Sequence, residues 1–417
     1  MELINQEYKA LWSKRNKLLF KFIFSYFTLY ILLLILSPVF ETPFRWIGNS
    51  ILGFNYDYDI NGFGSGDHTY AYITLFMNAV LTFIIVIFWA ILDRKRKNYN
   101  KLLYWFFVVL RFFLIGAMFL YGFVKIFKLQ FPSASLTHLL DPLGDFSPMG
   151  LAWTYMGFSK GFNVFVGFME VLGGLLLIPR RTQTLGSFII IGVMTQVAMM
   201  NFCYDIPVKL FSIHLILIAL VIFMTDIKRF LNVFIKNESV EKQNYYHPIK
   251  SPKYHNVIFW IKSIGLIVII GLMSFNFYTT ESHRGNKRIK PNLYGIWEAS
   301  YFVKNGDTLQ PLIADTYRWR YLIVDFKDVA TVKTMDDTKH HYTFISDSAS
   351  QKITIYKAEN KSDTLNFNFL RPNSNSLELN GKLENDSLKI IFSKKNLNDF
   401  KLNSRGFHWI NERPYNK

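Results

Sequence analysis

The 417-residue chain contains a single cysteine, Cys203. With no second thiol, it cannot form an internal disulfide or a CxxC redox pair. It also has no nucleotide-binding motif, and no second haem ligand can be matched with His214. These absences argue against an enzyme that carries its own redox centre.

Acidic residues are also few, since 30 aspartates and glutamates face 47 lysines and arginines, for a net charge of +17. A basic chain can indicate nucleic-acid binding. Here, however, the basic residues lie mainly between long apolar runs, where they orient a membrane protein. We therefore expect a lipid bilayer as the environment and no nucleic-acid partner.

Apolar residues are abundant, at 51% of the chain, with 18% aromatic. Seven apolar stretches are each long enough to cross about 30 Å of hydrocarbon as a helix. They lie at 18–40, 71–92, 103–127, 160–178, 184–203, 208–225 and 256–278. We predict a polytopic α-helical membrane protein, whose first stretch is too long for a cleaved signal peptide and is a permanent helix.

Lysine and arginine are concentrated in alternate connections: before the first stretch and after the second, fourth and sixth. The positive-inside rule then places the N-terminus in the cytoplasm and the C-terminal region outside. An odd number of spans agrees with that result. We predict a bacterial inner-membrane protein with a periplasmic C-terminal region.

The last part of the chain has a different pattern. Between turn residues, residues 292–417 contain short alternating runs that are typical of antiparallel strands. The runs lie at 294–303, 318–326, 330–335, 342–345, 352–356, 364–369, 377–383 and 388–393. We predict a β-barrel of about eight strands, with a sandwich as the alternative. Asn305-Gly306 and Asn380-Gly381 suit tight reversals or bulges.

These patterns define the expected domain order. It comprises two N-terminal spans (1–102, with an outer loop at 41–70), a four-span core (103–225), a cytoplasmic linker (226–255), the seventh span (256–278), a second linker (279–291) and the barrel (292–417).

The two outer loops carry residue types that can bind metals. In the stretch 55–67, the first half of a calcium-binding loop is matched, but the twelfth position is His68 instead of glutamate. An ordinary Asx/Gly-rich turn is the alternative. We interpret 129–160 as a re-entrant or interfacial cap rich in aromatic residues. Its three candidate metal ligands match no known template, so we expect no metal there: His138, Asp141 and Asp145.

Two charged residues lie inside apolar stretches, where charge is costly unless it faces protein or a cavity. Arg111 in the third stretch and Glu170 in the fourth are each about eight residues from the cytoplasmic end. At matched depth on antiparallel helices, they are expected to form an ion pair. The pair either fixes the helix register or makes Glu170 a proton-accepting, catalytic or ligand-facing group beside a pocket the size of a quinone.

A second polar cluster is expected at the outer ends of the core helices. Its candidate ligand-binding residues are Lys125, Asn201, Tyr204, Asp205, Lys209 and His214. Such groups suit a quinone carbonyl or an anionic head group. The alternative is a capped helical hairpin, held by an Asp205–Lys209 salt bridge, with His214 as a hydrogen-bonded core histidine.

Spans three to six resemble the DoxX family of small membrane proteins. The matching residues are Arg111, Gly116, Phe119, Gly122 and Lys125, then Glu170, Gly173 and Gly174, then Arg180-Arg181. The resemblance implies a four-helix membrane core. Because the name-giving member of the family looks like a quinone-linked thiosulfate oxidoreductase subunit, it also implies quinone as a possible cofactor. The additional spans and the barrel depart from a minimal DoxX protein.

The C-terminal domain separately resembles lipocalin-like barrels. Gly295-Ile296-Trp297 matches the G-x-W that opens the first strand of that group, and Arg405 is expected to stack on Trp297. Such a barrel holds either one small ligand or only its own side chains.

Two functions follow from these expectations. In the first, the protein is the quinone-facing membrane subunit of a periplasmic oxidoreductase, with Glu170 and Arg111 tuning proton transfer. In the second, it is a non-catalytic scaffold that presents the barrel to a partner complex or to lipid.

Overall fold

The computed structural model describes residues 12–54, 66–241, 252–357, 360–383 and 386–416. The chain forms two compact units. The helical unit comprises Met1–Phe131 and Pro148–Thr280, and the β unit comprises Pro132–Ser147 and Glu281–Lys417. The chain therefore enters the β unit twice.

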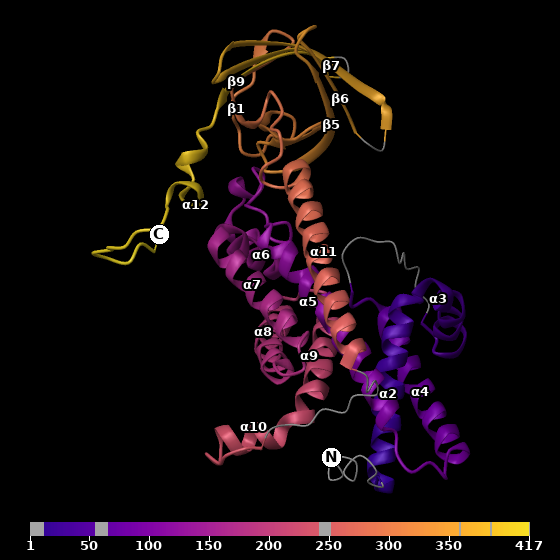
Figure 1. Cartoon of the computed structure of the whole chain (residues 1–417). Helices are drawn as coiled ribbons and strands as arrows, with labels where there is room; N and C mark the ends of the chain where they lie inside the picture. Colours follow the sequence, from indigo (N-terminus) through magenta and orange to yellow (C-terminus); the bar gives the residue numbers. More distant parts are fainter. Residues whose placement is uncertain (1–11, 55–65, 242–251, 358–359, 384–385, 417) are drawn as a thin grey trace. The chain divides into compact units, whose positions relative to one another are not determined.

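The helical unit consists mainly of long helices (Figure 1). The elements are α2 (Lys14–Ile35), α3 (Ser37–Trp46), the π-helical turn η1 (Ile47–Ile51), α4 (Thr69–Leu92), α5 (Asn100–Ile126), α6 (Pro148–Phe158), α7 (Lys160–Leu177), α8 (Gln183–Cys203), α9 (Lys209–Phe223), η4 (Met224–Asp226), α10 (Ile227–Phe234) and α11 (Pro252–Arg284).

Seven helices in the described part of the chain are long and apolar enough to cross a membrane. They correspond to the seven stretches predicted from hydropathy, so the predicted polytopic architecture is confirmed. Two ends differ. Helix α2 ends at Ile35 because Pro38 lies in the first turn of α3, where proline favours a helix start. The sixth apolar segment continues through α10 to Phe234 instead of ending near residue 225.

Four helices form the bundle that positions the site. Helix α5 packs against α7, α7 against α8, and α8 against α9, which contacts α5 in turn. Glycines allow α5 and α7 to approach closely: a Cβ atom on Gly122 would lie 2.7 Å from the Gly167 carbonyl oxygen. Any larger residue at this crossing would separate the helices. The Gly122–Gly167 contact thus sets the register between α5 and α7.

The β unit is an eight-stranded antiparallel closed barrel, as predicted. Its elements are β1 (Gly295–Lys304), the two-residue strand β2 (Asp307–Thr308), β3 (Trp319–Phe326), β4 (Val329–Thr334), β5 (Lys339–Asp347), β6 (Lys352–Lys357), β7 (Asn360–Asn373), β8 (Ser376–Leu383), β9 (Asp386–Lys394), η5 (Leu397–Asp399) and α12 (Lys401–Ser404). Each long strand pairs with the next, and β1 pairs with β9 to close the barrel, while β2 extends the edge of β1.

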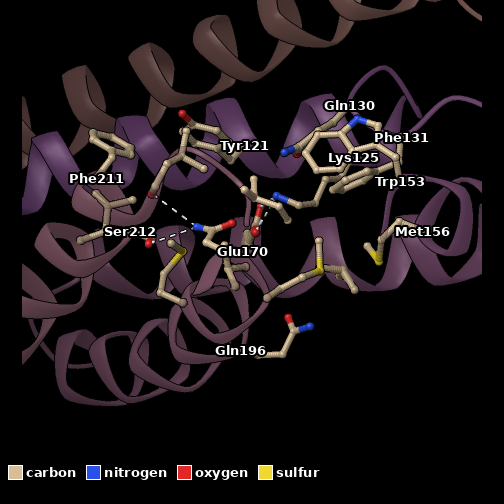
Figure 2. Close-up of a pocket in the computed structure, with 18 of the residues that line it drawn as sticks. Tyr121, Lys125, Gln130, Phe131, Trp153, Met156, Glu170, Gln196, Phe211 and Ser212 are labelled. Atoms are coloured by element: carbon tan, nitrogen blue, oxygen red, sulfur yellow. Dashed lines mark hydrogen bonds and ion pairs between the residues drawn. The ribbon is translucent and has the colours of Figure 1, made fainter. Parts of the chain in front are cut away.

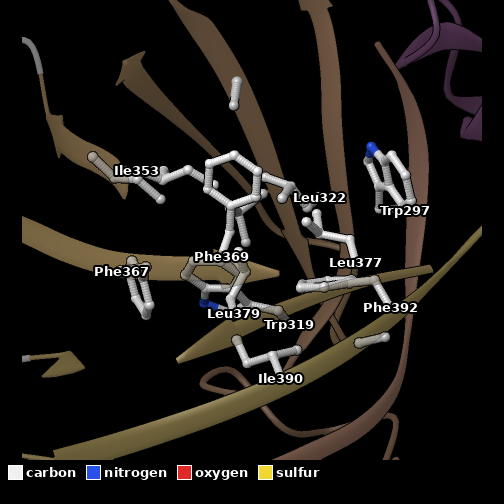
Figure 3. Packing of buried hydrophobic residues seen from close by; sticks show 14 of the residues in the cluster. Trp297, Trp319, Leu322, Ile353, Phe367, Phe369, Leu377, Leu379, Ile390 and Phe392 are labelled. Atoms are coloured by element: carbon white, nitrogen blue, oxygen red, sulfur yellow. The ribbon is translucent and has the colours of Figure 1, made fainter. Parts of the chain in front are cut away.

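The barrel interior is packed with apolar side chains from all eight long strands (Figure 3). Trp297 is fully buried, and its indole N–H donates a hydrogen bond to the Leu293 carbonyl at 2.8 Å. Trp319, Phe367 and Phe392 belong to the same buried cluster. Of the two alternatives for the barrel, this packing favours an interior occupied by its own side chains.

Two details of the predicted barrel were wrong. The first is the position of Arg405, which was expected to stack on Trp297 but lies over the Tyr415 ring at 4.6 Å. The cation near the Trp297 ring is instead Lys394, at 5.3 Å. The cause is strand pairing, since β9 places Lys394 directly opposite Trp297 on β1.

Asn380-Gly381 forms neither a reversal nor a bulge, because both residues continue the β8 ladder opposite β7. Glycine is needed there for a different reason: a Cβ atom on Gly381 would lie 2.6 Å from the Asn366 carbonyl oxygen. Asn305-Gly306 does form a reversal, with positive φ angles of 52° and 94° between β1 and β2.

The stretch 129–160 is not a single cap. Residues Pro132–Ser147 belong to the β unit, where Leu136 packs against Ile296 and Asp141 accepts a hydrogen bond from Lys339 at 2.7 Å. Within this segment lie the short helices η2 (His138–Leu140) and η3 (Leu143–Asp145). Helix α6, in contrast, belongs to the helical unit and carries Trp153.

Candidate ligand-binding pocket in the helical bundle

A cavity of about 290 Å³ lies among α5, α6, α7, α8 and α9 (Figure 2). Its walls are mainly apolar and include Trp153 and a group of methionines. The polar side chains that line it are Tyr121, Lys125, Gln130, Glu170, Gln196, Asn201 and Ser212. An apolar cavity with a few convergent polar groups is typical of a small-molecule site.

Lys125 and Glu170 form an ion pair at the wall of the cavity (Figure 2). The Lys125 ammonium lies 2.8 and 3.0 Å from the two carboxylate oxygens of Glu170. Only 3% of Lys125 and 0% of Glu170 is exposed. Burying either charge alone would be strongly unfavourable, so each residue depends on the other.

Helix register explains why these two residues meet. Helices α5 and α7 run antiparallel: a Cβ atom on Gly122 would lie 3.2 Å from the backbone N of Val171, and one on Gly167 would lie 3.0 Å from the backbone N of Ile126. Lys125 precedes Ile126 and Glu170 precedes Val171, so the two side chains lie at nearly the same level along the bundle.

The expected Arg111–Glu170 ion pair was wrong. Arg111 instead donates hydrogen bonds to the carbonyl oxygens of Leu177, at 2.8 Å from its Nε, and of Ile178. These carbonyls end α7 and have no partner within the helix, so a cation there also complements the helix dipole. The prediction aligned the ends of the apolar stretches, whereas Glu170 pairs with Lys125, which lies 14 residues (125 minus 111) or about 21 Å further along α5 than Arg111.

Asn201 and Ser212 join α8 to α9 beside the cavity. The Asn201 side-chain amide donates to the Ser212 hydroxyl at 3.1 Å and to the Val208 carbonyl at 3.4 Å. Ser212 in turn donates to the Lys209 carbonyl at 2.9 Å. This network fixes the α8–α9 connection that forms one wall of the pocket.

The predicted outer cluster is only partly assembled. Lys125 and Asn201 line the cavity, together with Glu170, but Tyr204, Asp205, Lys209 and His214 do not. Tyr204 and Asp205 are exposed, and Asp205 pairs with Lys209 at 3.0 Å in the salt bridge expected for a capped hairpin.

His214 is a buried, hydrogen-bonded residue. Its Nδ1 lies 2.7 Å from the Leu210 carbonyl oxygen, and its Nε2 lies 2.9 Å from the Tyr26 hydroxyl. The Tyr30 ring stacks on it with 4.0 Å between centroids. His214 therefore connects α9 to α2.

Of the stretch that resembles a calcium loop, 55–65 lies outside the described residues. Asp67 accepts hydrogen bonds from the backbone N–H groups of Lys209 and Leu210, and His68 caps α4 by accepting from Ala71. Within the described residues, no group of three or more His, Cys, Asp or Glu side chains is arranged to hold a metal ion.

Tyr121, Gln130 and Gln196 also line the pocket but were not predicted from the sequence. A long polar side chain inside an apolar helix, such as Gln196 in α8, could have indicated a pocket residue. Whether such a side chain faces the cavity or the lipid depends on helix packing, which hydropathy does not predict.

The fold and the site define a class: a polytopic membrane protein with a helical bundle, a bundle pocket and a β-barrel domain. No protein-family model and no solved structure matches the chain. Over 124 residues, 30% of this chain, it is 31% identical to the "Uncharacterized protein YwoB" of Bacillus subtilis (strain 168). The match covers 79% of YwoB, and through it the chain belongs to the same family as that protein.

Proposed function

We propose that the helical unit binds a small amphipathic molecule, with a quinone as the main candidate, in the cavity beside Lys125 and Glu170. The observation that carries the proposal is a fully buried ion pair that opens onto an apolar cavity. Ionisable residues inside membrane segments are rare and commonly mark ligand or proton pathways.

The size and chemistry of the cavity support this choice. At about 290 Å³, it is at the lower end of the range for ligand pockets and suits a single-ring head group. Lys125 uses two of its three N–H donors on Glu170, which leaves one for a quinone carbonyl. Glu170 can accept a hydrogen bond from the hydroxyl of the reduced quinol.

The proposed role is that of a quinone-facing subunit of a periplasmic oxidoreductase, as the resemblance to the DoxX family implies. A quinol releases two protons and two electrons on oxidation. The Lys125–Glu170 pair would exchange the protons, and a redox group on a partner protein would take the electrons. We assign Arg111 a positioning role, because it holds the end of α7. The distribution of basic residues supports an inner-membrane location with a cytoplasmic N-terminus and a periplasmic barrel.

A second candidate function is a scaffold. The packed interior of the barrel favours it, because a filled barrel acts through its outer surface. In this role the barrel would bind a partner complex or lipid, and Lys125–Glu170 would serve only to hold α5 against α7.

Identification of bound small molecules separates the two functions. Wild-type protein, Glu170→Gln and Lys125→Met would be purified in nanodiscs, extracted with organic solvent and analysed by mass spectrometry per mole of folded protein. Asp226→Asn is the matched control, because Asp226 is a buried carboxylate in the same unit that bonds Thr184 and Arg229 and does not line the cavity.

We expect near-stoichiometric quinone in the wild type and in the control, and at least a tenfold loss in the two pocket variants. Equal amounts of bulk phospholipid and no quinone in all four samples would overturn the quinone proposal. If the barrel is the functional part, deletion of 292–417 abolishes capture of the partner; unchanged capture would contradict the scaffold role.

A further inference from the structure

The interface between α2 and α4 buries a group of polar side chains away from the pocket. Ser25, Asn78 and Thr82 are 4%, 1% and 0% exposed. Four of their atoms, Ser25 Oγ, Asn78 Nδ2 and Oδ1, and Thr82 Oγ1, form no hydrogen bond with any described residue. Asn78 and Thr82 lie one turn apart on α4, which packs along α2.

Such a group is unfavourable if it is dry. A buried polar group without a partner costs about 1–3 kcal/mol, and serine or threonine in a helix normally bonds to its own backbone. Buried water molecules typically satisfy clustered donors and acceptors of this kind, each with about three hydrogen bonds. The polar α2–α4 interface is therefore a site for ordered water.

Titratable groups lie at one end of this interface. Lys21, one turn before Ser25 on α2, is 4% exposed and donates to the Trp89 carbonyl at 2.9 Å. At the end of α4, Asp93 accepts a hydrogen bond from the Tyr99 hydroxyl at 3.0 Å. This end reaches the last turn of α4 and the connection to α5.

The other end of the interface reaches His214. Asn78 is close to the Tyr26 hydroxyl, although no hydrogen bond between them meets the distance and angle limits. The Tyr26 hydroxyl is hydrogen-bonded to His214 Nε2. Because His214 Nδ1–H donates to the Leu210 carbonyl, the neutral imidazole keeps its lone pair on Nε2 and accepts the Tyr26 O–H. His214 follows Ser212 on α9, and Ser212 lines the pocket.

We propose that the α2–α4 interface is a hydrated proton route from the Lys21–Asp93 end of the bundle to the Tyr26–His214 pair. In the transfer step, Tyr26 passes its hydroxyl proton to His214 Nε2 and takes one from an adjacent protonated water, so hydronium becomes water and His214 becomes imidazolium. The tyrosine is unchanged and no electrons move. The route stands on residues outside the pocket; only its use in protonating a pocket ligand rests on the proposed function.

The groups that face His214 are consistent with a relay. Tyr26 and Tyr30 approach it from α2. Tyr121 of α5, which lines the pocket, is within electrostatic range of Tyr30. Lys21 lies further along α2 and Asp93 directly follows α4, and both Asp93 and Lys17 of α2 act electrostatically on Lys21.

Hydrogen–deuterium exchange at the imidazole Cε1–H of His214, followed by mass spectrometry, tests water access directly. The full-length protein in nanodiscs would be compared with the triple variant Ser25→Ala/Asn78→Leu/Thr82→Val. Ser187→Ala is the matched control, since Ser187 is equally buried but bonds to the Gln183 carbonyl within its own helix.

In the wild type and in Ser187→Ala, we expect the exchange rate of His214 to be within about tenfold of the rate of an exposed histidine. In the triple variant, we expect His214 to exchange at least tenfold more slowly than in the wild type. If the triple variant does not fold, Thr82→Val alone, which keeps the side-chain shape, is combined with radiolytic labelling by ¹⁸O-water. Tyr26 should then be labelled well above the buried control Phe106 in the wild type and less in Thr82→Val.

An unexchanged His214 in the wild type, or exchange that the apolar substitutions leave unchanged, would overturn the proposal. The interface would then be dry, and the apolar substitutions should raise stability. Ligand content, measured on the same samples, reports separately on the pocket.

Discussion

Removal of the Lys125 charge should be among the most damaging single changes in the helical unit. In Lys125→Met, the Glu170 carboxylate loses hydrogen bonds of 2.8 and 3.0 Å at a site where it is 0% exposed. Breaking a buried pair by removing one partner typically costs about 3–5 kcal/mol. The double variant Lys125→Met/Glu170→Gln carries no buried charge, so we expect it to lose less than about 2 kcal/mol.

Reversible SDS-induced unfolding in mixed micelles, followed by tryptophan fluorescence, measures these free energies. The matched control is Asp205→Asn, which breaks an ion pair whose carboxylate is 88% exposed and should cost less than about 1 kcal/mol. If Lys125→Met unfolds like this control, or if the double variant loses the sum of both single losses, then the two charges are not an isolated buried pair.

Three further predictions concern other parts of the molecule. Gly122→Val places methyl groups against the backbone of α7, so unfolding should become easier by about 1–3 kcal/mol and bound ligand should be lost; an unchanged midpoint would refute the helix register. Trp297→Ala removes a fully buried side chain from the barrel and should cost about 3–5 kcal/mol in calorimetry of the full chain. A smaller loss than in Trp409→Ala, 90% exposed, would contradict the packed interior. Hydrogen bonds from Lys304 and Asn305 hold the pKa of Asp386 below its usual value of 3.8. The stability that Asp386 contributes is therefore present above about pH 4 and is lost as pH falls through the lower folded pKa. In pH-dependent unfolding, Asp386→Asn should lose less stability on acidification than the wild type, and an equal loss in both proteins would exclude the effect.

Hydropathy and side-chain alternation were sufficient to predict the main architecture. The apolar stretch 71–92 predicts α4 to within two residues at each end, because a helix that faces lipid has to be apolar along its length. The alternating run 377–383 predicts β8 equally well, because one side of that strand faces the barrel interior.

Contacts between distant elements could not be predicted in the same way. The level of Glu170 relative to α5 depends on the Gly122–Gly167 contact. Because the prediction had a different helix register, it paired Glu170 with Arg111, whereas the structure pairs it with Lys125. Similarly, Leu136 packs in the β unit although it precedes α7 in the chain, and no local pattern indicates that return.

The polar interface between α2 and α4 is an intermediate case. A single Asn78 or Thr82 in an apolar stretch is visible in the sequence. That both are buried, one turn apart on a helix that packs along α2, is shown only by the packed helices. The sequence can therefore nominate such residues, but only the fold can show that they form one buried group.

Photolabelling with an azidoquinone in nanodiscs tests the proposed pocket most directly. The proposal predicts label on peptides that contain Trp153, Met156 or Met200, competed by excess unlabelled quinone and reduced in Glu170→Gln. Label confined to outward-facing positions such as Phe83 of α4, and insensitive to competitor, would contradict a quinone site in the bundle.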